Sequence, residues 1–180
     1  MHKNYLAIDL GAESGRTILG TLVDAKLVLR EIHRFANQPI QLPNVLHWDI
    51  LRLWAEIKAG IAKTVKDGTK LDSLGVDTWG VDFALLDNAG NLLANPTHYR
   101  DARTDGMLDE AFALMERNEI FANTGIQFMQ LNTLYQLLAM VKADSPLFEI
   151  AETFLTIPDL LNYWLSGKLT NEFTNATTTQ

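Results

Sequence analysis

Apolar residues gather in three short segments near the start of the chain, and each segment ends at turn residues, a pattern that favours β-strands. Gly11 and Gly15 lie in the first connection, and Asp24-Ala25-Lys26 forms the second. We therefore predict a meander of three antiparallel strands. They are expected over residues 5–8, 16–23 and 27–35.

The spacing of apolar residues becomes helical after residue 48. Asp49 is a suitable N-cap and Gly68 a suitable stop, with apolar side chains mostly three or four residues apart between them. Residues 71–79 are the next predicted strand, so the order of elements indicates a mixed sheet with a right-handed crossover to a parallel strand. Residues 37–45 contain two prolines and no periodicity, so we expect a loop there.

The rest of the chain alternates short strands with helices, which indicates an α/β fold. In the helix expected over residues 132–143, Leu134, Leu137, Leu138 and Val141 share one apolar face. Residues 171–180 are polar where a domain should be closing, so we expect the order of elements to continue beyond this chain. The other expected elements are extended segments over 81–86 and 91–93 joined by a turn at 87–90, helices over 105–117, 118–124 and 158–165, and a buried strand over 153–157.

The composition is that of one globular domain, with 180 residues of which 47% are hydrophobic and 21% charged. A net charge of −7 argues against a nucleic-acid partner, which would require a basic surface. The chain has no cysteine, so it forms neither disulfides nor thiolate zinc sites. It shows neither a signal peptide nor an apolar run of roughly 20 residues, so no membrane partner and a cytoplasmic location are expected.

The first turn carries the residue types of an anion site. Gly11 and Gly15 permit positive φ, so backbone N–H groups between them can converge on a phosphate. Asp9, at the end of the first strand, is a candidate ligand for hydrated magnesium, which prefers one or two carboxylates plus phosphate oxygens. The alternative is a plain hairpin in which the glycines only turn the chain and Asp9 is solvated.

Two later segments carry further candidates. Asp77, Gly80 and Asp82 follow a predicted parallel strand, and open α/β sheets bind ligands outside the carboxyl ends of such strands. These carboxylates suit hydroxyl groups or a metal, although Asp77 could instead cap a backbone turn. Asp101 and Arg103 lie in a polar connection, where arginine suits anions and sugar hydroxyls, with a surface ion-pair cluster as the alternative.

Other motifs narrow the chemistry. His33, His47 and His98 are far apart without ligand spacing, so a histidine metal site is not expected. The Gly-x-x-x-x-Gly-Lys-Ser/Thr motif of P-loop proteins is absent from the sequence, so the first turn is the expected phosphate-binding segment. Residues 175–179 read as either a hydrogen-bonding loop or a frayed end.

Together these motifs resemble the amino-terminal part of the FGGY carbohydrate kinases, and they occur in the right order over nearly the whole chain. The segments 77–83 and 175–180 resemble in particular the members that act on L-rhamnulose. The segments that carry the resemblance are 9–16, 30–35, 75–83, 99–104, 125–128, 132–137 and 175–180.

The resemblance implies a ribonuclease-H-like, actin-like ATPase fold, a mixed sheet with flanking helices, which is incomplete at the C-terminus of this chain. Residues 1–180 would be an amino-terminal kinase domain whose partner is a carboxy-terminal domain of the same protein. ATP and Mg²⁺ would be the cofactors, with Asp9 near the metal. The residues implied to face the ATP phosphates are Ala12, Glu13, Ser14, Gly15 and Arg16.

The implied substrate is L-rhamnulose, phosphorylated at its 1-hydroxyl, and the matching substrate-contact position is Gly80. From the chemistry above, we add Asp77, Asp82 and Arg103 as substrate-binding candidates. The family's catalytic base belongs to a later His-Asp-Thr motif, so no catalytic residue is expected in this chain. The alternatives are a kinase for another ketose, such as L-fuculose or xylulose, and a non-catalytic sugar- or nucleotide-binding module.

Overall fold

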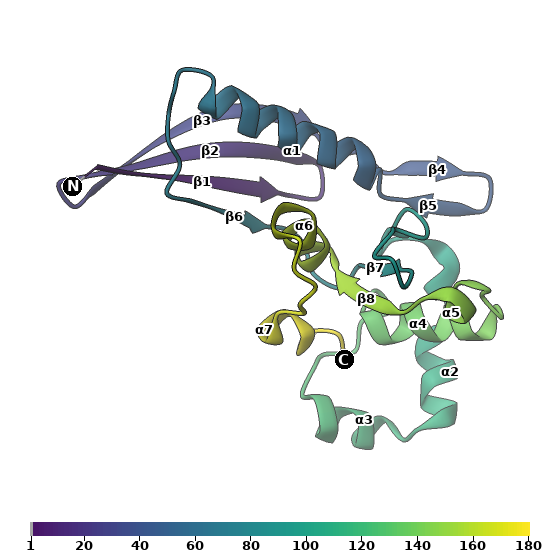
Figure 1. The fold of residues 1–180 in the computed structure, drawn as a ribbon. Coiled ribbons are helices and arrows are strands. Elements are labelled where there is room, and N and C mark those ends of the chain that lie inside the picture. Colours follow the sequence, from purple (N-terminus) through teal and green to yellow (C-terminus); the bar gives the residue numbers. More distant parts are fainter. Residues whose placement is uncertain (1) are drawn as a thin grey trace. The chain divides into compact units, whose positions relative to one another are not determined.

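A computed structural model describes residues 2–180 of the chain (Figure 1). The chain divides into two compact units. Unit 1 holds the residues up to Gln38 together with Asp49–Trp79, and unit 2 holds Pro39–Trp48 and Gly80–Gln180. That residues 1–180 act as one domain of a larger protein stays a prediction.

Unit 1 is built on a four-stranded mixed sheet in the order β3-β2-β1-β6. Strands β1 (His2–Leu10), β2 (Ser14–Val23) and β3 (Lys26–Ala36) form the predicted antiparallel meander. Strand β6 (Ser73–Asp77) pairs with β1 in parallel. The α/β fold with a mixed sheet is therefore confirmed.

Helix α1 (Ile50–Val65) lies along one face of this sheet (Figure 1). It begins as predicted at Asp49, whose side chain accepts a hydrogen bond from the Arg52 N–H. Gly60 allows the helix to approach β2 closely, because a Cβ at this position would lie 2.5 Å from Thr17 Cγ2. The apolar side chains buried in this unit include Leu6, Ile8, Leu10, Leu53 and Ile57.

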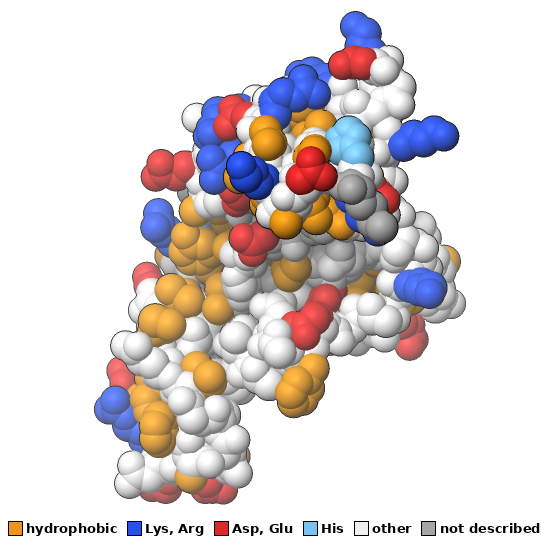
Figure 2. All heavy atoms as spheres, turned by 90° about the vertical axis from the view of Figure 1, so that its left-hand side faces the viewer, with side chains coloured by type: hydrophobic (Ala, Val, Ile, Leu, Met, Phe, Trp, Pro, Cys, Tyr) orange, Lys and Arg blue, Asp and Glu red, His pale blue; other side chains and the backbone are white. Residues whose placement is uncertain are grey.

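The opposite face of the sheet carries apolar side chains that unit 1 leaves exposed. Leu27 and Leu29 of β3 are 59% and 65% exposed. Figure 2 shows that exposed hydrophobic side chains also lie among Lys, Arg, Asp and Glu side chains on one side of the molecule. Single exposed apolar residues are normal, but a group of them on one sheet face is a surface that another element can cover.

Unit 2 begins with a hairpin where we predicted a loop. Strands β4 (Ile40–Leu42) and β5 (Val45–His47) pair across the two residues Pro43 and Asn44. The prediction was wrong because Pro43 was counted only as a strand breaker. Proline also presets the backbone for the first turn position, and asparagine tolerates the second.

The core of unit 2 lies around a second, two-stranded antiparallel sheet, β7 (Phe83–Leu86) and β8 (Thr153–Thr156). Phe83 and Leu85 pack there with Met140. The predicted pairing of residues 91–93 occurs as one bridge, between Leu86 and Leu92. The helices are α2 (Met107–Leu114), α3 (Arg117–Thr124), α4 (Thr133–Lys142), α5 (Leu147–Ile150), α6 (Ile157–Ser166) and α7 (Phe173–Ala176), with a 3₁₀ turn over Ala102–Thr104.

The four longer helices of unit 2 occur where the sequence predicts them, whereas α5 and α7 were not predicted. Both are single turns, and α7 depends on a side chain, since the Glu172 carboxylate accepts from the N–H groups of Thr174 and Asn175. In α4 the predicted apolar face is only partly buried: Leu137 packs against the core, whereas Val141 is 56% exposed. The most buried face carries Tyr135, Gln136 and Met140 instead. Among residues 2–180, no helix has the length and apolar character needed to cross a membrane.

Candidate functional site

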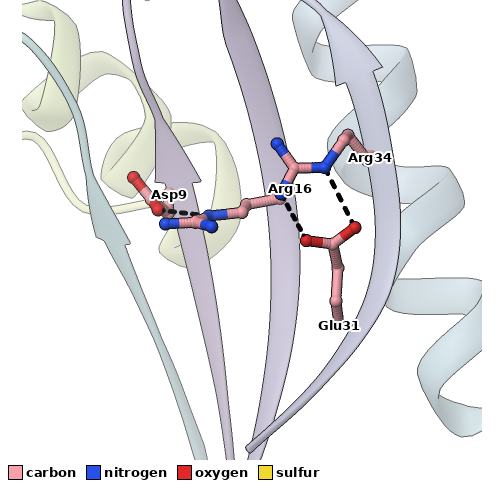
Figure 3. Close-up of polar contacts among 4 residues, drawn as sticks. All are labelled: Asp9, Arg16, Glu31 and Arg34. Atoms are coloured by element: carbon pink, nitrogen blue, oxygen red, sulfur yellow. Dashed lines mark hydrogen bonds and ion pairs between the residues drawn. The ribbon is translucent and has the colours of Figure 1, made fainter.

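Asp9 and Arg16 face each other across β1 and β2, beside the turn that joins these strands. Arg16 Nε donates to Asp9 Oδ2 at 2.7 Å, and the two side chains are 42% and 34% exposed for Arg16 and Asp9 (Figure 3). Arg34 of β3 makes a second ion pair, with Glu31 of the same strand. Both pairs reach solvent, so their charges are open to a ligand at little desolvation cost.

The register extends this pair into a charged row, which we define as Asp77, Asp9, Arg16 and Arg34 in strand order. Asp77 is the parallel partner of Asp9, and Arg34 is the antiparallel partner of Arg16. Paired residues of neighbouring strands lie on the same face of a sheet, so the row crosses all four strands on one face. Two carboxylates therefore adjoin two guanidinium groups at the end of β1.

The donor set of this row fits a hydrated magnesium ion. Mg²⁺ is usually held by one or two carboxylates, with water and substrate phosphates completing its octahedron. Asp9 and Asp77 are two such carboxylates on adjacent strands. Within residues 2–180, no group of three or more His, Cys, Asp or Glu side chains is placed to hold a metal. A closed, all-protein metal cage is therefore not the arrangement found in the described chain.

The positive φ that we expected at the two glycines of the turn is not found, so this part of the prediction is corrected. Neither Gly11 nor Gly15 has a positive φ. A Cβ on Gly15 would lie 2.3 Å from Phe35 Cε2, so this glycine is required by the aromatic ring beside it. The Gly11 N–H donates to the Ser14 carbonyl at 2.8 Å and is not available to an anion.

Two other N–H groups of the turn, those of Ala12 and Glu13, donate no hydrogen bond within residues 2–180. These N–H groups, not that of Gly11, are the ones that an anion can meet at this turn. The predicted phosphate contacts at residues 12–16 stay a prediction, now assigned to particular donors.

In unit 2, Gly80 to Asp82 form a tight turn with a strained centre. Val81 has φ of 67°, a left-handed conformation that β-branched residues rarely adopt. The Asp82 N–H donates to the Gly80 carbonyl at 2.9 Å, which closes a three-residue turn. The Val81 carbonyl accepts from Thr133 Oγ1 at 2.7 Å and from Gln136 Nε2 at 3.3 Å. Helix α4 thus holds this strained turn in place.

Asp82 is completely buried beside that turn. Its Oδ2 accepts from Trp48 Nε1 at 2.5 Å and its Oδ1 from Gln136 Nε2 at 2.9 Å. Gln136 Oε1 in turn accepts from an Arg103 terminal nitrogen at 2.7 Å. We call these four residues, with Thr133, the polar network. Since Asp82 is enclosed, its predicted contact with a substrate has no direct route in unit 2.

Arg103 is half-buried and its guanidinium donates to Gln136 Oε1, so the surface ion-pair alternative does not describe it. Burial lowers the Arg103 pKa, and the carboxylates of Asp101 and Asp82 oppose this shift. Asp101 is buried and accepts from the backbone N–H groups of Leu46 and Arg103 at 2.6 and 3.0 Å. The carboxylate therefore fixes the backbone that carries Arg103.

His98 is buried against Trp48, with their ring centroids 4.0 Å apart. Its Nδ1 accepts from the Arg100 N–H at 3.0 Å. Desolvation, followed by the charge of Arg100, lowers the His98 pKa to about 4. His98 is thus a neutral packing residue, consistent with the absence of metal-ligand spacing.

Gly80 is bordered by the last helical turn of the chain. A Cβ on Gly80 would lie 3.7 Å from Asn175 Oδ1 and 3.8 Å from Thr178 Oγ1. Asn175 Nδ2 donates to Thr156 Oγ1 at 2.7 Å, so residues 175–179 form a hydrogen-bonded segment and not a frayed end. Asp77 belongs to unit 1 and Gly80 to unit 2, so their predicted cluster stays a prediction.

Sequence reasoning missed that Thr133, Gln136 and Trp48 form hydrogen bonds in the polar network. The sequence contained one indication for Gln136. It is a polar residue next to Tyr135 in an amphipathic helix, and a polar side chain that is buried in such a helix needs a hydrogen-bond partner. Nothing in the local pattern of Trp48 distinguishes its indole N–H donor from an ordinary core residue.

Comparison with known proteins gives a consistent result over the whole chain. Relatives named rhamnulokinase include one from Oceanobacillus iheyensis, 49% identical over 180 residues, and one from Bacteroides thetaiotaomicron, 43% identical over 180 residues. The matches cover 100% of this chain, but 38% and 37% of the two relatives. The chain thus spans well under half the length of these relatives.

Solved structures share the fold at low sequence identity. A gluconate kinase from Lactobacillus acidophilus matches with a TM-score of 0.86 and 18% identity, over 99% of this chain and 36% of that one. The model of the "FGGY family of carbohydrate kinases, N-terminal domain" matches residues 4–180. The chain therefore belongs to the FGGY family of carbohydrate kinases.

Proposed function

We propose that this chain is the amino-terminal part of an ATP-dependent kinase that phosphorylates L-rhamnulose at its 1-hydroxyl. One observation carries the choice of substrate, the 49% identity over all 180 residues with a relative named rhamnulokinase. Structures of kinases for other sugars match at only 18% identity and support the fold alone. Because ATP is the phosphate donor, we further propose a cytoplasmic location.

The turn between β1 and β2 is the proposed phosphate contact. Within residues 2–180 the N–H groups of Ala12 and Glu13 donate no hydrogen bond, and the partly exposed Arg16 lies near the start of β2, just after them in the chain. Backbone donors and a planar guanidinium suit phosphate oxygens, and phosphoryl transfer depends mainly on positioning and charge stabilisation. Ser14 and Gly15 complete the proposed segment, with Gly15 needed for the fit of Phe35.

Asp9, with Asp77 beside it, is the proposed carboxylate side of the magnesium site. When bound, Mg²⁺ supplies positive charge that neutralises phosphate oxygens during transfer. Asp9 has a second function in the free protein, since it accepts from Arg16 Nε and holds this guanidinium near the turn. Arg16 would thus be positioned before any nucleotide binds.

Gly80 is the proposed sugar contact, and the polar network is its support. Asp82 is buried and the half-buried Arg103 is bonded to Gln136, so we assign both to positioning: they hold Gln136, which binds the carbonyl of Val81 next to Gly80. Asp77 is exposed and remains a candidate for direct contact. We propose no catalytic base in this chain, and we expect residues 1–180 alone to be inactive, since positioning one substrate without the reacting groups gives no acceleration.

The substrate is tested by measuring ADP release by the full-length protein with ATP, Mg²⁺ and a panel of L-rhamnulose, L-fuculose and D-xylulose. We expect the highest kcat/KM with L-rhamnulose. A higher kcat/KM with another ketose would overturn the substrate proposal. No turnover with any sugar, combined with measurable sugar or nucleotide binding, would favour the binding-module alternative.

The phosphate contact is tested by Arg16→Ala in the full-length protein, with Arg30→Ala as the control on the exposed surface of β3. We expect Arg16→Ala to raise the KM for ATP about ten-fold while the KM for the sugar stays constant. Its exposed ion pair contributes less than about 1 kcal/mol, so the melting temperature should change little. The reverse pattern, a lower melting temperature with unchanged kinetics, would assign Arg16 to stability.

A further inference from the structure

Asn37 follows β3 directly and is buried, with 1% of its surface exposed. Its Nδ2 donates to the Gly11 carbonyl at 2.7 Å, and its backbone N–H donates to the Glu13 carbonyl at 2.9 Å. One residue therefore binds two carbonyl groups of the turn between β1 and β2. Both contacts lie within unit 1.

The bond to the Gly11 carbonyl determines which way the Ala12 N–H group points. In a trans peptide, the carbonyl of one residue and the N–H of the next point in opposite directions. Because the Gly11 carbonyl points to Asn37, the Ala12 N–H in the same peptide points away from Asn37. The Ala12 N–H makes no hydrogen bond within residues 2–180, so it remains available to a ligand.

The end of β3, next to Asn37, is fixed by contacts with α1 and β2. An Arg52 terminal nitrogen of α1 donates to the Ala36 carbonyl at 2.7 Å. Phe35 packs against Gly15, where no Cβ would fit. Three consecutive residues, 35 to 37, thus connect the turn to the packed part of unit 1, and the turn cannot rotate its peptides without breaking a contact.

Asn37 also carries a feature that stability alone does not explain. Its Oδ1 is buried and has no hydrogen-bond partner within residues 2–180. The amide orientation is required by chemistry, because only the NH₂ group can meet the Gly11 carbonyl. A buried oxygen without a hydrogen-bond partner lowers the stability of the fold. The Asn37 side chain is therefore suited to donating to the turn and not to maximal stability.

We propose that Asn37 is a positioning residue for nucleotide phosphate, which orients the Gly11–Ala12 peptide of the turn so that the Ala12 N–H group faces the phosphate oxygens. The inference rests on the proposed function, because it concerns the same turn. Asn37 acts through Gly11 and Glu13 and needs no contact with the nucleotide itself. The preorganised turn would avoid the cost of reorienting peptides upon binding.

The test uses Asn37→Leu in the full-length protein, which keeps the approximate shape, adds no charge and removes the donor. We expect the Kd for ATP to rise about five- to ten-fold, with no change in the Kd for adenosine, which lacks phosphate. The KM for L-rhamnulose should be unchanged. Asn37→Ser, which keeps a shorter hydroxyl donor, should give an intermediate Kd and serves if the leucine variant does not fold.

Asn4→Leu is the matched control, because Asn4 Nδ2 makes a comparable bond to the Lys70 carbonyl, 3.1 Å long, in the same unit. It should lower the melting temperature without changing the Kd for ATP. If Asn37→Leu and Asn37→Ser behave like this control, the inference is overturned while the proposed function stands. If the unaltered protein binds no ATP, the proposed function itself fails.

Discussion

The charged row of unit 1 and the polar network of unit 2 use similar side chains in opposite environments. Both contain aspartate and arginine. In the row, Asp9 and Arg16 are about one-third to two-fifths exposed, whereas Asp82 of the network is completely buried and both of its oxygens are occupied. The same residue types thus meet solvent in one region and other polar side chains in the other.

This difference separates two ways of building a binding site. Exposed charges bind each other weakly, so a ligand can exchange with an existing partner at low cost. A buried carboxylate pays a large desolvation cost and requires fixed donors, so it is suited to hold the backbone in one conformation. In unit 1 the side chains are the proposed contacts, and in unit 2 they support a strained turn that presents Gly80.

The strongest test of the comparison is Asp82→Asn. The amide has one acceptor oxygen for the two donors of Trp48 and Gln136, and its NH₂ group would face a donor. We expect the free energy of unfolding to fall by about 3 kcal/mol, measured by urea denaturation. The control is Asp77→Asn in the charged row, which should leave the urea midpoint unchanged. Equal effects of the two variants would contradict the contrast between buried and exposed carboxylates.

A pH titration tests the interior of unit 2 through His98. Its pKa is about 4 in the folded chain against 6.5 as the ordinary value, so the unfolded chain binds the proton more readily. The stability is fully present above pH 6.5 and is lost as the pH falls toward 4, by at most about 2 kcal/mol at about pH 5. Arg100 and Asp101 are the charged neighbours that oppose each other here.

The measurement is urea denaturation of the chain at about pH 7.5 and about pH 5, repeated with His98→Phe. Phenylalanine keeps an aromatic ring against Trp48 and removes the titrating group. The variant should lose part of the pH dependence, although it also removes the acceptor of the Arg100 N–H. An unchanged pH dependence in the variant would assign the acid sensitivity to other groups.

Val81→Gly tests whether the turn stores strain. Glycine adopts a φ of 67° without the clash of a β-branched side chain, so the free energy of unfolding should rise by about 1 kcal/mol. The control is Val76→Gly in β6, where glycine should destabilise because the backbone is extended. In the full-length protein, we expect Val81→Gly to lower turnover despite the added stability. A destabilised Val81→Gly variant would show that side-chain packing outweighs strain.

The smallest effect is expected in the charged region at Glu31. The hydrogen bond from Arg34 lowers the Glu31 pKa, with a further contribution from the charges of Arg34 and Arg16. Arg34→Ala should return the Glu31 pKa toward its ordinary range, as measured by NMR titration of the side-chain carboxyl. The melting temperature should stay the same, because both side chains are largely exposed. A clear loss of stability would mean that this surface pair is more than a local electrostatic contact.

Local patterns predicted most of the elements, because they reflect short-range physics. The meander, helix α1 with its Asp49 cap and the four longer helices of unit 2 follow from apolar spacing and turn residues. The hairpin at β4 and β5 was missed because three-residue strands are too short to show a period. The buried face of α4 was predicted incorrectly because the prediction used only the apolar residues Leu and Val. Gln136 is polar, and it is buried because it forms hydrogen bonds with other parts of unit 2.

The sequence by itself determined the family, the mixed sheet and the presence of Asp9, Arg16 and Gly80 in or next to turns, since these depend on residue type and order along the chain. Only the tertiary structure decided which polar groups are enclosed and which are open. The structure assigns Asp82 and Arg103 to supporting positions and places Asn37 beside the first turn. The hydrogen-bond partners concerned are 26 to 54 residues apart, so their pairing is set by packing and cannot be read from the local sequence.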